Sequence, residues 1–252
     1  MKHLSQLTPA ELLLLTKERV THRELLKITF IDLLFKHVLK THEVERQPHP
    51  RDKIRAYKYV GIGRNFEAYI SQNHERVFLS SFVADNSIEV LFSNLVKIAY
   101  QKSRTLLCYK DDIYKTPTLK KCFSQNIFQK LFHNYSITDY GKKLKREVKE
   151  EIQKEGNALA DISSVESKKA IELINIIGAN IFLLVNLDYE LLNQIDQNLG
   201  TIINQVNASD NSVGCTSWSF DDYSSSFDSS CSGHSGSGGD SGCGGCGGCG
   251  GD

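Results

Sequence analysis

The sequence predicts a mainly α-helical fold with small β-hairpin wings, arranged as two winged-helix-like units followed by a disordered tail. Three observations lead to this prediction. Capping signals precede apolar residues at helical spacing, which indicates helices. Two such helices are followed by two strand-like runs, which is the element order of a winged helix. The composition then changes after residue 208 to Ser, Gly, Asp and Cys. The predicted units are residues 1–72, 73–208 and 209–252.

The first unit contains two predicted helices and a hairpin. In LTPAELLLLTKE, we expect Thr8 as the N-cap, Pro9 as the first helical residue and Glu11 as the partner in a capping box. Thr21 and Glu24 repeat the capping box at the start of THRELLKITFIDLLFKHVL, which has apolar residues at helical spacing. The runs LKTHEVER and IRAYKYVGIG have strand character. The prolines of QPHPRDK place that segment in the loop between them.

The second unit is predicted because the order of elements recurs at an offset of 66 residues, with Thr21 aligned on Ser87. In this alignment RTLLCYKDDIYKT takes the place of the ribbon. Two helical segments follow, TLKKCFSQNIFQKLFHNY and SITDYGKKLKREVKEEIQKEG. The latter begins at Ser136 or Thr138, and its Lys and Glu residues indicate a solvated face. One or two helices in residues 165–199 are expected to close the body.

The charge of the chain is divided between its two ends. All 30 Lys and Arg lie in residues 1–169 together with 20 Asp and Glu, so this part carries a net charge of +10. Residues 170–252 contain ten acidic residues and no Lys or Arg, which gives −10. This asymmetry indicates that body and tail attract each other, or that the body meets an anionic partner.

The apolar segments predict a cytoplasmic protein without a transmembrane segment. The run Leu12–Leu15 is too short for the core of a signal peptide. Residues 170–192, AIELINIIGANIFLLVNLDYELL, have an uncharged core of 15 residues, whereas a spanning helix needs about 20. We therefore expect a buried helix of the body, with a peripheral or re-entrant segment as the alternative. Exposed thiols would stay reduced in the cytoplasm.

The body shows no catalytic motif. Gly61-Ile62-Gly63 lacks the third glycine of a dinucleotide-binding fingerprint, and there is no Walker motif or His-Glu-x-x-His pair. Cys108 and Cys122 lie among apolar neighbours and are expected to be buried, inert thiols. They could act as nucleophiles only if a histidine came close in space. A non-enzymatic protein is therefore expected.

The chain ends in SGCGGCGGCGGD, with Cys243, Cys246 and Cys249 separated only by glycines. Thiolates bind zinc or another thiophilic metal, and Cys231 or His234 could supply a fourth ligand. Against this, a frame of glycine supplies no groups that orient the ligands. The same cysteines are equally candidates for covalent modification, because glycine leaves each sulfur accessible. A plain low-complexity tail, predicted to be disordered because 11 of its last 20 residues are glycine, is the third interpretation.

The chain resembles a group of bacterial proteins of unknown function that have an LTPAE-like N-terminal helix, a winged-helix-like body and a Gly/Cys-rich C-terminal end. The resemblance is carried by Leu7–Leu15, the repeated helix pair and the tail segment Cys243–Gly251. It implies no activity. Many members of that group have membrane segments, and a clear one is lacking here. The start LTPAELLLL is also similar to the Golgi phosphoprotein 3 family, which binds phosphoinositide headgroups, but none of its binding residues can be carried over.

Three functions are consistent with these patterns. The preferred one is a carrier or interaction protein that presents its Cys-rich tail to a tail-modifying enzyme or partner protein, or captures a metal. Mass spectrometry of protein from its native host tests it, since unmodified, metal-free thiols would exclude it. The second is a nucleic-acid-binding winged-helix module, indicated by the basic body and testable by salt-dependent binding. The third is binding of anionic lipid or of a partner protein through the same cations.

Overall fold

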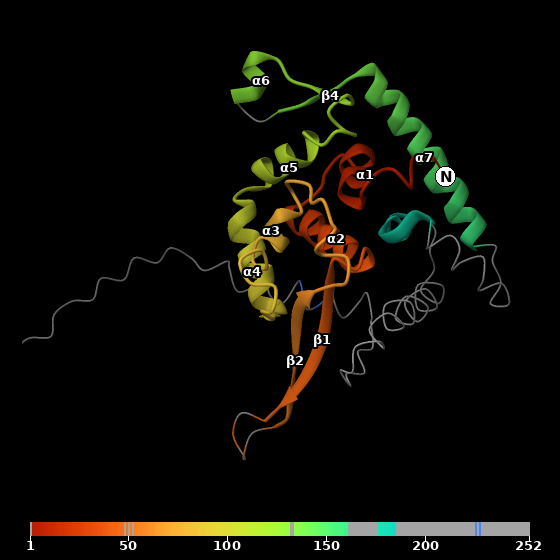
Figure 1. The fold of residues 1–252 in the computed structure, drawn as a ribbon. Coiled ribbons are helices and arrows are strands. Elements are labelled where there is room, and N and C mark those ends of the chain that lie inside the picture. Colours follow the sequence, from red (N-terminus) through yellow and green to blue (C-terminus); the bar gives the residue numbers. More distant parts are fainter. Residues whose placement is uncertain are drawn as a thin grey trace, which may run out of the picture.

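The fold is known from a computed structural model (Figure 1), which describes residues 2–47, 49, 51, 53–131, 134–160, 176–184, 225 and 227. Within this part of the chain helices predominate, and they are accompanied by small antiparallel sheets. The predicted mainly helical body with a small hairpin is confirmed at this level. The finer assignment of two winged-helix units is not confirmed.

Helices α1 (Pro9–Thr16) and α2 (His22–Phe35) begin at the two predicted capping boxes. The backbone N–H of Thr8 donates to Glu11 Oε2 at 2.7 Å, and that of Thr21 donates to Glu24 Oε2 at 2.7 Å. In return, each threonine hydroxyl accepts the backbone N–H of its glutamate. These reciprocal bonds satisfy N–H groups that a helix start leaves without intrahelical partners.

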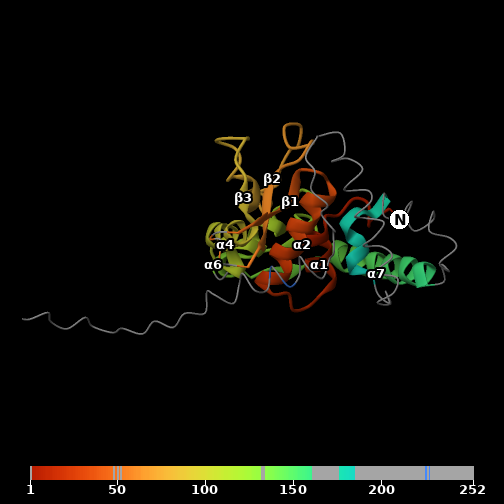
Figure 2. The same cartoon turned by 90° about the horizontal axis from the view of Figure 1, so that it is seen from below.

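Helix α2 is the central element of the body. Nine of its fourteen residues are buried. The Phe30 ring packs against Phe78 of α3 (Arg76–Leu79) at 5.5 Å and against Phe92 of α4 (Phe92–Ser103) at 5.1 Å between ring centroids. Both views place α4 and α7 on opposite sides of α1 and α2 (Figure 1 and Figure 2). Most of α2 is therefore covered by its neighbours.

The predicted hairpin is confirmed. Strands β1 (Leu39–Arg46) and β2 (Arg55–Ile62) pair antiparallel over eight residue pairs, and the short strand β3 (Val90–Leu91) pairs with the root of β2. Figure 1 shows the hairpin projecting from the helical body. Leu39 and Val60 are buried at its root, whereas Arg46 and Arg55 are exposed at its far end.

The prediction that RTLLCYKDDIYKT forms a β-ribbon is wrong. This segment forms α5 (Leu106–Tyr114), whose N-terminus is capped by the Thr105 side chain accepting the Cys108 N–H at 3.2 Å. Tyr109 and Ile113, four residues apart, are fully buried and face the core. The apolar residues at helical spacing therefore form one buried helical face, and the element order of the first unit does not recur here.

The following segment is only partly helical. Strand β4 (Phe123–Ser124) pairs with β5 (Ser136–Ile137), and the short α6 (Ile127–Leu131) lies between them, where a helical segment was expected. Helix α7 (Asp139–Ala160) follows Thr138, one of the two predicted caps, whose hydroxyl oxygen accepts the Gly141 N–H at 3.1 Å. Its charged residues are mostly solvated. Its buried side is formed by Leu144, Val148 and Ile152.

The apolar segment 170–192 is described only at residues 176–184. Its short 3-10 helix η2 (Gly178–Leu183) is buried against α1 and α2, consistent with the expected place in the body. The side-chain amide of Asn180 donates to the carbonyls of Leu4 at 2.6 Å and Leu7 at 2.8 Å. Across the described residues, none of the helices has the length and apolar character required to span a bilayer.

The predicted tail, residues 209–252, lies outside the described residues except at Ser225 and Phe227. Phe227 is buried, with 1% of its surface exposed. Its ring centroid lies 6.2 Å from that of Phe92 and 6.3 Å from that of Tyr100, both on α4.

Candidate functional site

The pairing register of the hairpin sorts its charges onto two faces. Successive side chains of a strand point to opposite faces, and directly paired residues share a face. His42 pairs with Tyr59, Val44 with Tyr57, and Arg46 with Arg55. One face, called the basic face below, therefore carries Lys40, His42, Val44, Arg46, Arg55, Tyr57 and Tyr59.

The opposite face carries the acidic residues of the two strands. Glu43 and Glu45 lie there together with Lys58, whose ammonium group is 3.4 Å from Glu43 Oε1. An acidic side chain from the segment before β3 contacts the basic face. It is Glu89, whose Oε2 lies 3.2 Å from His42 Nε2. The two faces of one ribbon thus differ in sign of charge.

Tyr59 is the centre of the basic face. The His42 ring is stacked on it, with centroids 5.7 Å apart and an interplanar angle of 19°. The guanidinium carbon of Arg46 lies 5.6 Å from the Tyr59 ring centroid. A cation over the face of an aromatic ring is attracted by the negative face of its quadrupole. This contact holds Arg46 along the ribbon.

The far end of the basic face concentrates positive charge. Arg46 and Arg55 occupy directly opposed positions and both are exposed, and Arg51 and Lys53 in the connecting turn are exposed as well. Like charges directly opposite each other on a sheet destabilise it. An anionic ligand would relieve this repulsion, so the arrangement is suited to bind anions.

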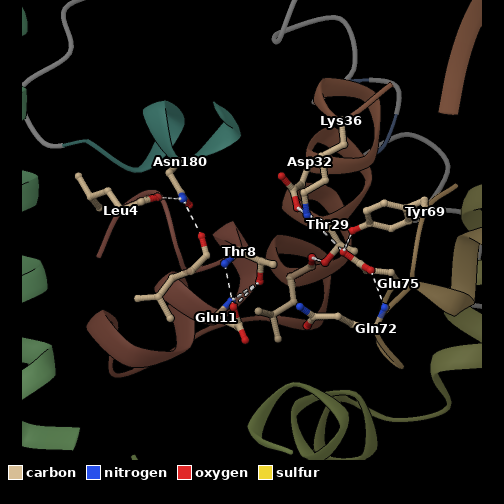
Figure 3. Close-up of polar contacts among 12 residues, drawn as sticks. Leu4, Thr8, Glu11, Thr29, Asp32, Lys36, Tyr69, Gln72, Glu75 and Asn180 are labelled. Carbon is tan, nitrogen blue, oxygen red and sulfur yellow. Dashed lines mark hydrogen bonds and ion pairs between the residues drawn. The ribbon is translucent and has the colours of Figure 1, made fainter. Parts of the chain in front are cut away.

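A group of buried charges fixes the root of the hairpin. It is called the root cluster and consists of Asp32, Lys36, Tyr69 and Glu75 (Figure 3). The Lys36 ammonium group lies 2.6 Å from Asp32 Oδ2 and 3.5 Å from Glu75 Oε1, and it donates to the Tyr69 hydroxyl oxygen at 3.1 Å. The Tyr69 hydroxyl donates to Glu75 Oε1 at 2.6 Å. These bonds join α2 to the segment that follows the hairpin.

Burial sets the protonation of the root cluster. Desolvation raises the pKa of Asp32 to about 6, although Lys36 opposes this shift. Desolvation alone would lower the pKa of Lys36, but the charges of Asp32 and Glu75 outweigh it and raise that pKa. Burial, aided by Glu75, also raises the pKa of Tyr69. The neighbouring His74 has a pKa lowered to about 4 by burial, and is therefore neutral at pH 7.

The backbone at the root leaves no room for an added side chain. His37, just after α2, has a φ of 52°, in the left-handed region. The N–H of Gly63 donates to the Val38 carbonyl at 2.8 Å, and the N–H of Asn65 donates to the His37 carbonyl at 3.0 Å. A Cβ at Gly63 would lie 2.2 Å from the His37 carbonyl oxygen. Glycine is therefore required where the chain leaves the hairpin.

The predicted metal ligands Cys231, Cys243, Cys246 and Cys249 lie outside the described residues, and so does the alternative ligand His234. Zinc binding and thiol modification in the tail stay predictions. Within the described ranges, no group of three His, Cys, Asp or Glu side chains is placed to hold a metal ion.

The two body cysteines differ in environment. Cys122 is buried, as predicted, and its thiol donates to the Thr118 carbonyl oxygen at 3.7 Å. Burial raises the pKa of Cys122, which disfavours the nucleophilic thiolate. Cys108, on α5, is only half-buried, in contrast to the expected burial.

The basic face was not predicted from the sequence, although its signal was present. Basic or aromatic residues occupy every second position along much of each predicted strand. They are Lys40, His42 and Arg46 in the first strand and Arg55, Tyr57 and Tyr59 in the second. The sequence does not state which residues pair, and a slip by one residue would move the second set to the other face.

No protein-family model, no curated protein and no solved structure matches the chain. The resemblance to the bacterial group with a Gly/Cys-rich end therefore stays a prediction. So does the similarity to the Golgi phosphoprotein 3 family.

Proposed function

We propose that the protein is a non-enzymatic nucleic-acid-binding protein that holds single-stranded DNA or RNA on the basic face of its hairpin. The observation that carries this proposal is the register of the two strands. It gathers Lys40, His42, Arg46 and Arg55 with two tyrosines on one face, while the acidic residues of the strands occupy the other. Cations neutralise phosphates, and aromatic rings stack on unpaired bases.

The composition of the basic face favours single strands over duplexes. The planar guanidinium groups of Arg46 and Arg55 and the half-buried Tyr57 ring offer flat surfaces for bases, which a duplex keeps stacked inside. In a winged helix the hairpin would be the wing. Since α2 is buried, the contact with nucleic acid is assigned to this wing and not to a helix in the major groove.

A membrane is the less favoured anionic partner for this face. Surface binding to a bilayer draws on buried apolar area as well as on charge. Among the described residues of the hairpin, Ile54 in the turn is the large hydrophobic residue that is exposed, at 63%. One such side chain provides little apolar area, whereas the cations and tyrosines extend along the ribbon.

The test is fluorescence anisotropy of labelled oligo(dT) and oligo(U), titrated with the full-length chain at several salt concentrations. For about three phosphates contacted, the logarithm of the association constant should fall with the logarithm of salt concentration with a slope of about −2. Arg55→Ala should weaken binding and make the slope shallower by about 0.7.

The matched control is Lys58→Ala, which removes one positive charge from the same strand but from the opposite face. It should leave both affinity and slope almost unchanged. Equal losses in the two variants would show that net charge, and not the basic face, governs binding. Binding to anionic vesicles with no binding to either oligonucleotide at low salt would exclude the proposal.

A further inference from the structure

We propose that the C-terminal segment docks in cis through Phe227 beside the root of the hairpin, and that its carboxylates compete with nucleic acid for the basic face. The competition rests on the proposed function, whereas the docking rests on a contact in the structure. The occupant of the docking site is therefore a segment of this chain itself.

The docking contact is an aromatic one. Phe227 is 1% exposed, although the last described segment before residue 225 ends at residue 184. Its ring lies between Phe92 and Tyr100, which are two turns apart on α4. Burying a phenylalanine side chain removes apolar surface from water, and the covalent tether keeps that side chain near its site, so both favour the docked state.

The docking site extends the aromatic core of the body. The Tyr100 ring also packs edge-on against His22, with centroids 5.1 Å apart, and the Phe92 ring packs against Phe30. A residue packed between Phe92 and Tyr100 thus covers the outer side of this group of aromatic rings. A body without this residue would expose part of its aromatic core to water.

The docking site is adjacent to the basic face. Phe92 directly follows β3, and Leu91 of β3 pairs with Tyr59, the central residue of that face. Neighbouring strands lie about 4.8 Å apart, so Phe92 is attached to the sheet beside Tyr59. Docking at Phe92 therefore brings the tail to the root of the hairpin.

The residues around Phe227 carry the charge that would compete. The segment is WSFDDYSSSFD, in which Asp221, Asp222 and Asp228 lie within six residues of Phe227 and no basic residue occurs. Six residues span at most about 21 Å, so the chain length limits the distance of these carboxylates from a docked Phe227. The carboxylates of this segment resemble the phosphates of a single-stranded nucleic acid in charge, and its aromatic side chains resemble the bases in shape.

The experiment compares the full-length chain with three variants: Phe227→Ala, the conservative Phe227→Leu, and a triple change of Asp221, Asp222 and Asp228 to Asn. Docking is measured by hydrogen exchange of peptides covering residues 92–103 and 220–230. Competition is measured by anisotropy of labelled oligo(dT) at low salt. Circular dichroism checks that the body of each variant keeps its helices.

Phe227→Ala should speed exchange in both peptides and tighten oligonucleotide binding about fivefold, the change expected if one fifth of wild-type molecules are undocked. Phe227→Leu should stay within twofold of wild type in both readouts. The triple Asn variant should keep slow exchange in residues 92–103 and still bind tighter, because it removes the competing charge and leaves the anchor.

The two parts of the proposal fail separately. Unchanged exchange in Phe227→Ala would overturn docking. Faster exchange with unchanged affinity in both Phe227→Ala and the triple variant would overturn competition, while oligonucleotide binding itself would still support the proposed function. Absence of binding by all four chains at low salt would overturn the proposed function and the competition together, and the exchange data would still decide whether Phe227 is an anchor.

Discussion

The root cluster and the basic face use the same kinds of side chain in opposite ways. In the root cluster, the Lys36 ammonium group lies within 3.5 Å of two carboxylates and a tyrosine hydroxyl. On the basic face, Arg46 and Arg55 stand opposite each other in solvent. Buried charges must be matched inside the protein, because desolvation is costly. Exposed charges tolerate like neighbours, and this leaves them available for a ligand.

The largest expected change in stability comes from removing the cation that balances the carboxylates of the root cluster. Lys36→Met leaves Asp32 and Glu75 buried without their cation and should lower the free energy of unfolding by about 3 kcal/mol. This is the low end for a buried pair, because 33% of the Lys36 side chain is exposed. Urea denaturation measures it.

Two controls sharpen this result. Lys102→Met removes an exposed lysine that donates to the Ser80 hydroxyl oxygen, and should cost less than about 1 kcal/mol. Adding Asp32→Asn to Lys36→Met should recover part of the loss, since it removes one uncompensated charge. Equal losses for Lys36 and Lys102 would contradict the difference drawn between buried and exposed charges.

The second prediction separates two buried groups by pH. Asp32 has a folded-state pKa of about 6, above its ordinary value, so its contribution to stability is full at low pH and is lost as pH rises through 6. His74 has a folded-state pKa of about 4, below its ordinary value of about 6.5, so its contribution is present above 6.5 and is lost as pH falls through 4. Between pH 4 and 6 the two oppose each other.

Asp32→Asn should therefore make the free energy of unfolding rise steeply from pH 4 to 6.5, by about 3 kcal/mol from His74. His74→Gln should make it fall with increasing pH over the same range. Urea denaturation at pH 4, 5, 6 and 7 gives the slopes. Parallel profiles for wild type and both variants would show that neither group titrates in this window.

The third prediction concerns Gly63, which lies between the hairpin that carries the basic face and the segment that contributes Tyr69 and Glu75 to the root cluster. Gly63→Ala places a Cβ 2.2 Å from the His37 carbonyl oxygen and should destabilise the protein by about 2 kcal/mol, because backbone has to move. Gly61→Ala, two residues earlier at the end of β2, is the matched control. Its nearest contact would be Glu89 Cγ at 3.7 Å, an ordinary distance, so the change in stability should be below about 0.5 kcal/mol.

Gly63→Ala also tests whether the root positions the basic face. A displaced hairpin should weaken oligonucleotide binding several-fold even at temperatures where the variant is fully folded, and Gly61→Ala should not. If both variants bound like wild type while Gly63→Ala lost stability, the root would serve stability alone.

The sequence was sufficient where local chemistry decides the structure. Both capping boxes, at Thr8 and Thr21, and both strands of the hairpin occur as predicted. The prediction failed for α5, because the place that the repeat alignment gave this segment was followed in preference to the spacing of Leu106, Tyr109 and Ile113, which suits a helix. The candidate site could be predicted only as alternating residues in two strands, since pairing partners were unknown.

The helix starts, the hairpin and the division of charge could be predicted from the residues alone, because they depend on neighbours within a few residues or on composition. Which face of the hairpin is basic, the burial of nine of the fourteen residues of α2, and the contact of the Asp32–Lys36 pair with Glu75 follow from the packing of distant segments. So does the packing of Phe227 on α4. Each of these depends on a contact between residues far apart in the chain, whose burial and pairing energies local sequence does not contain.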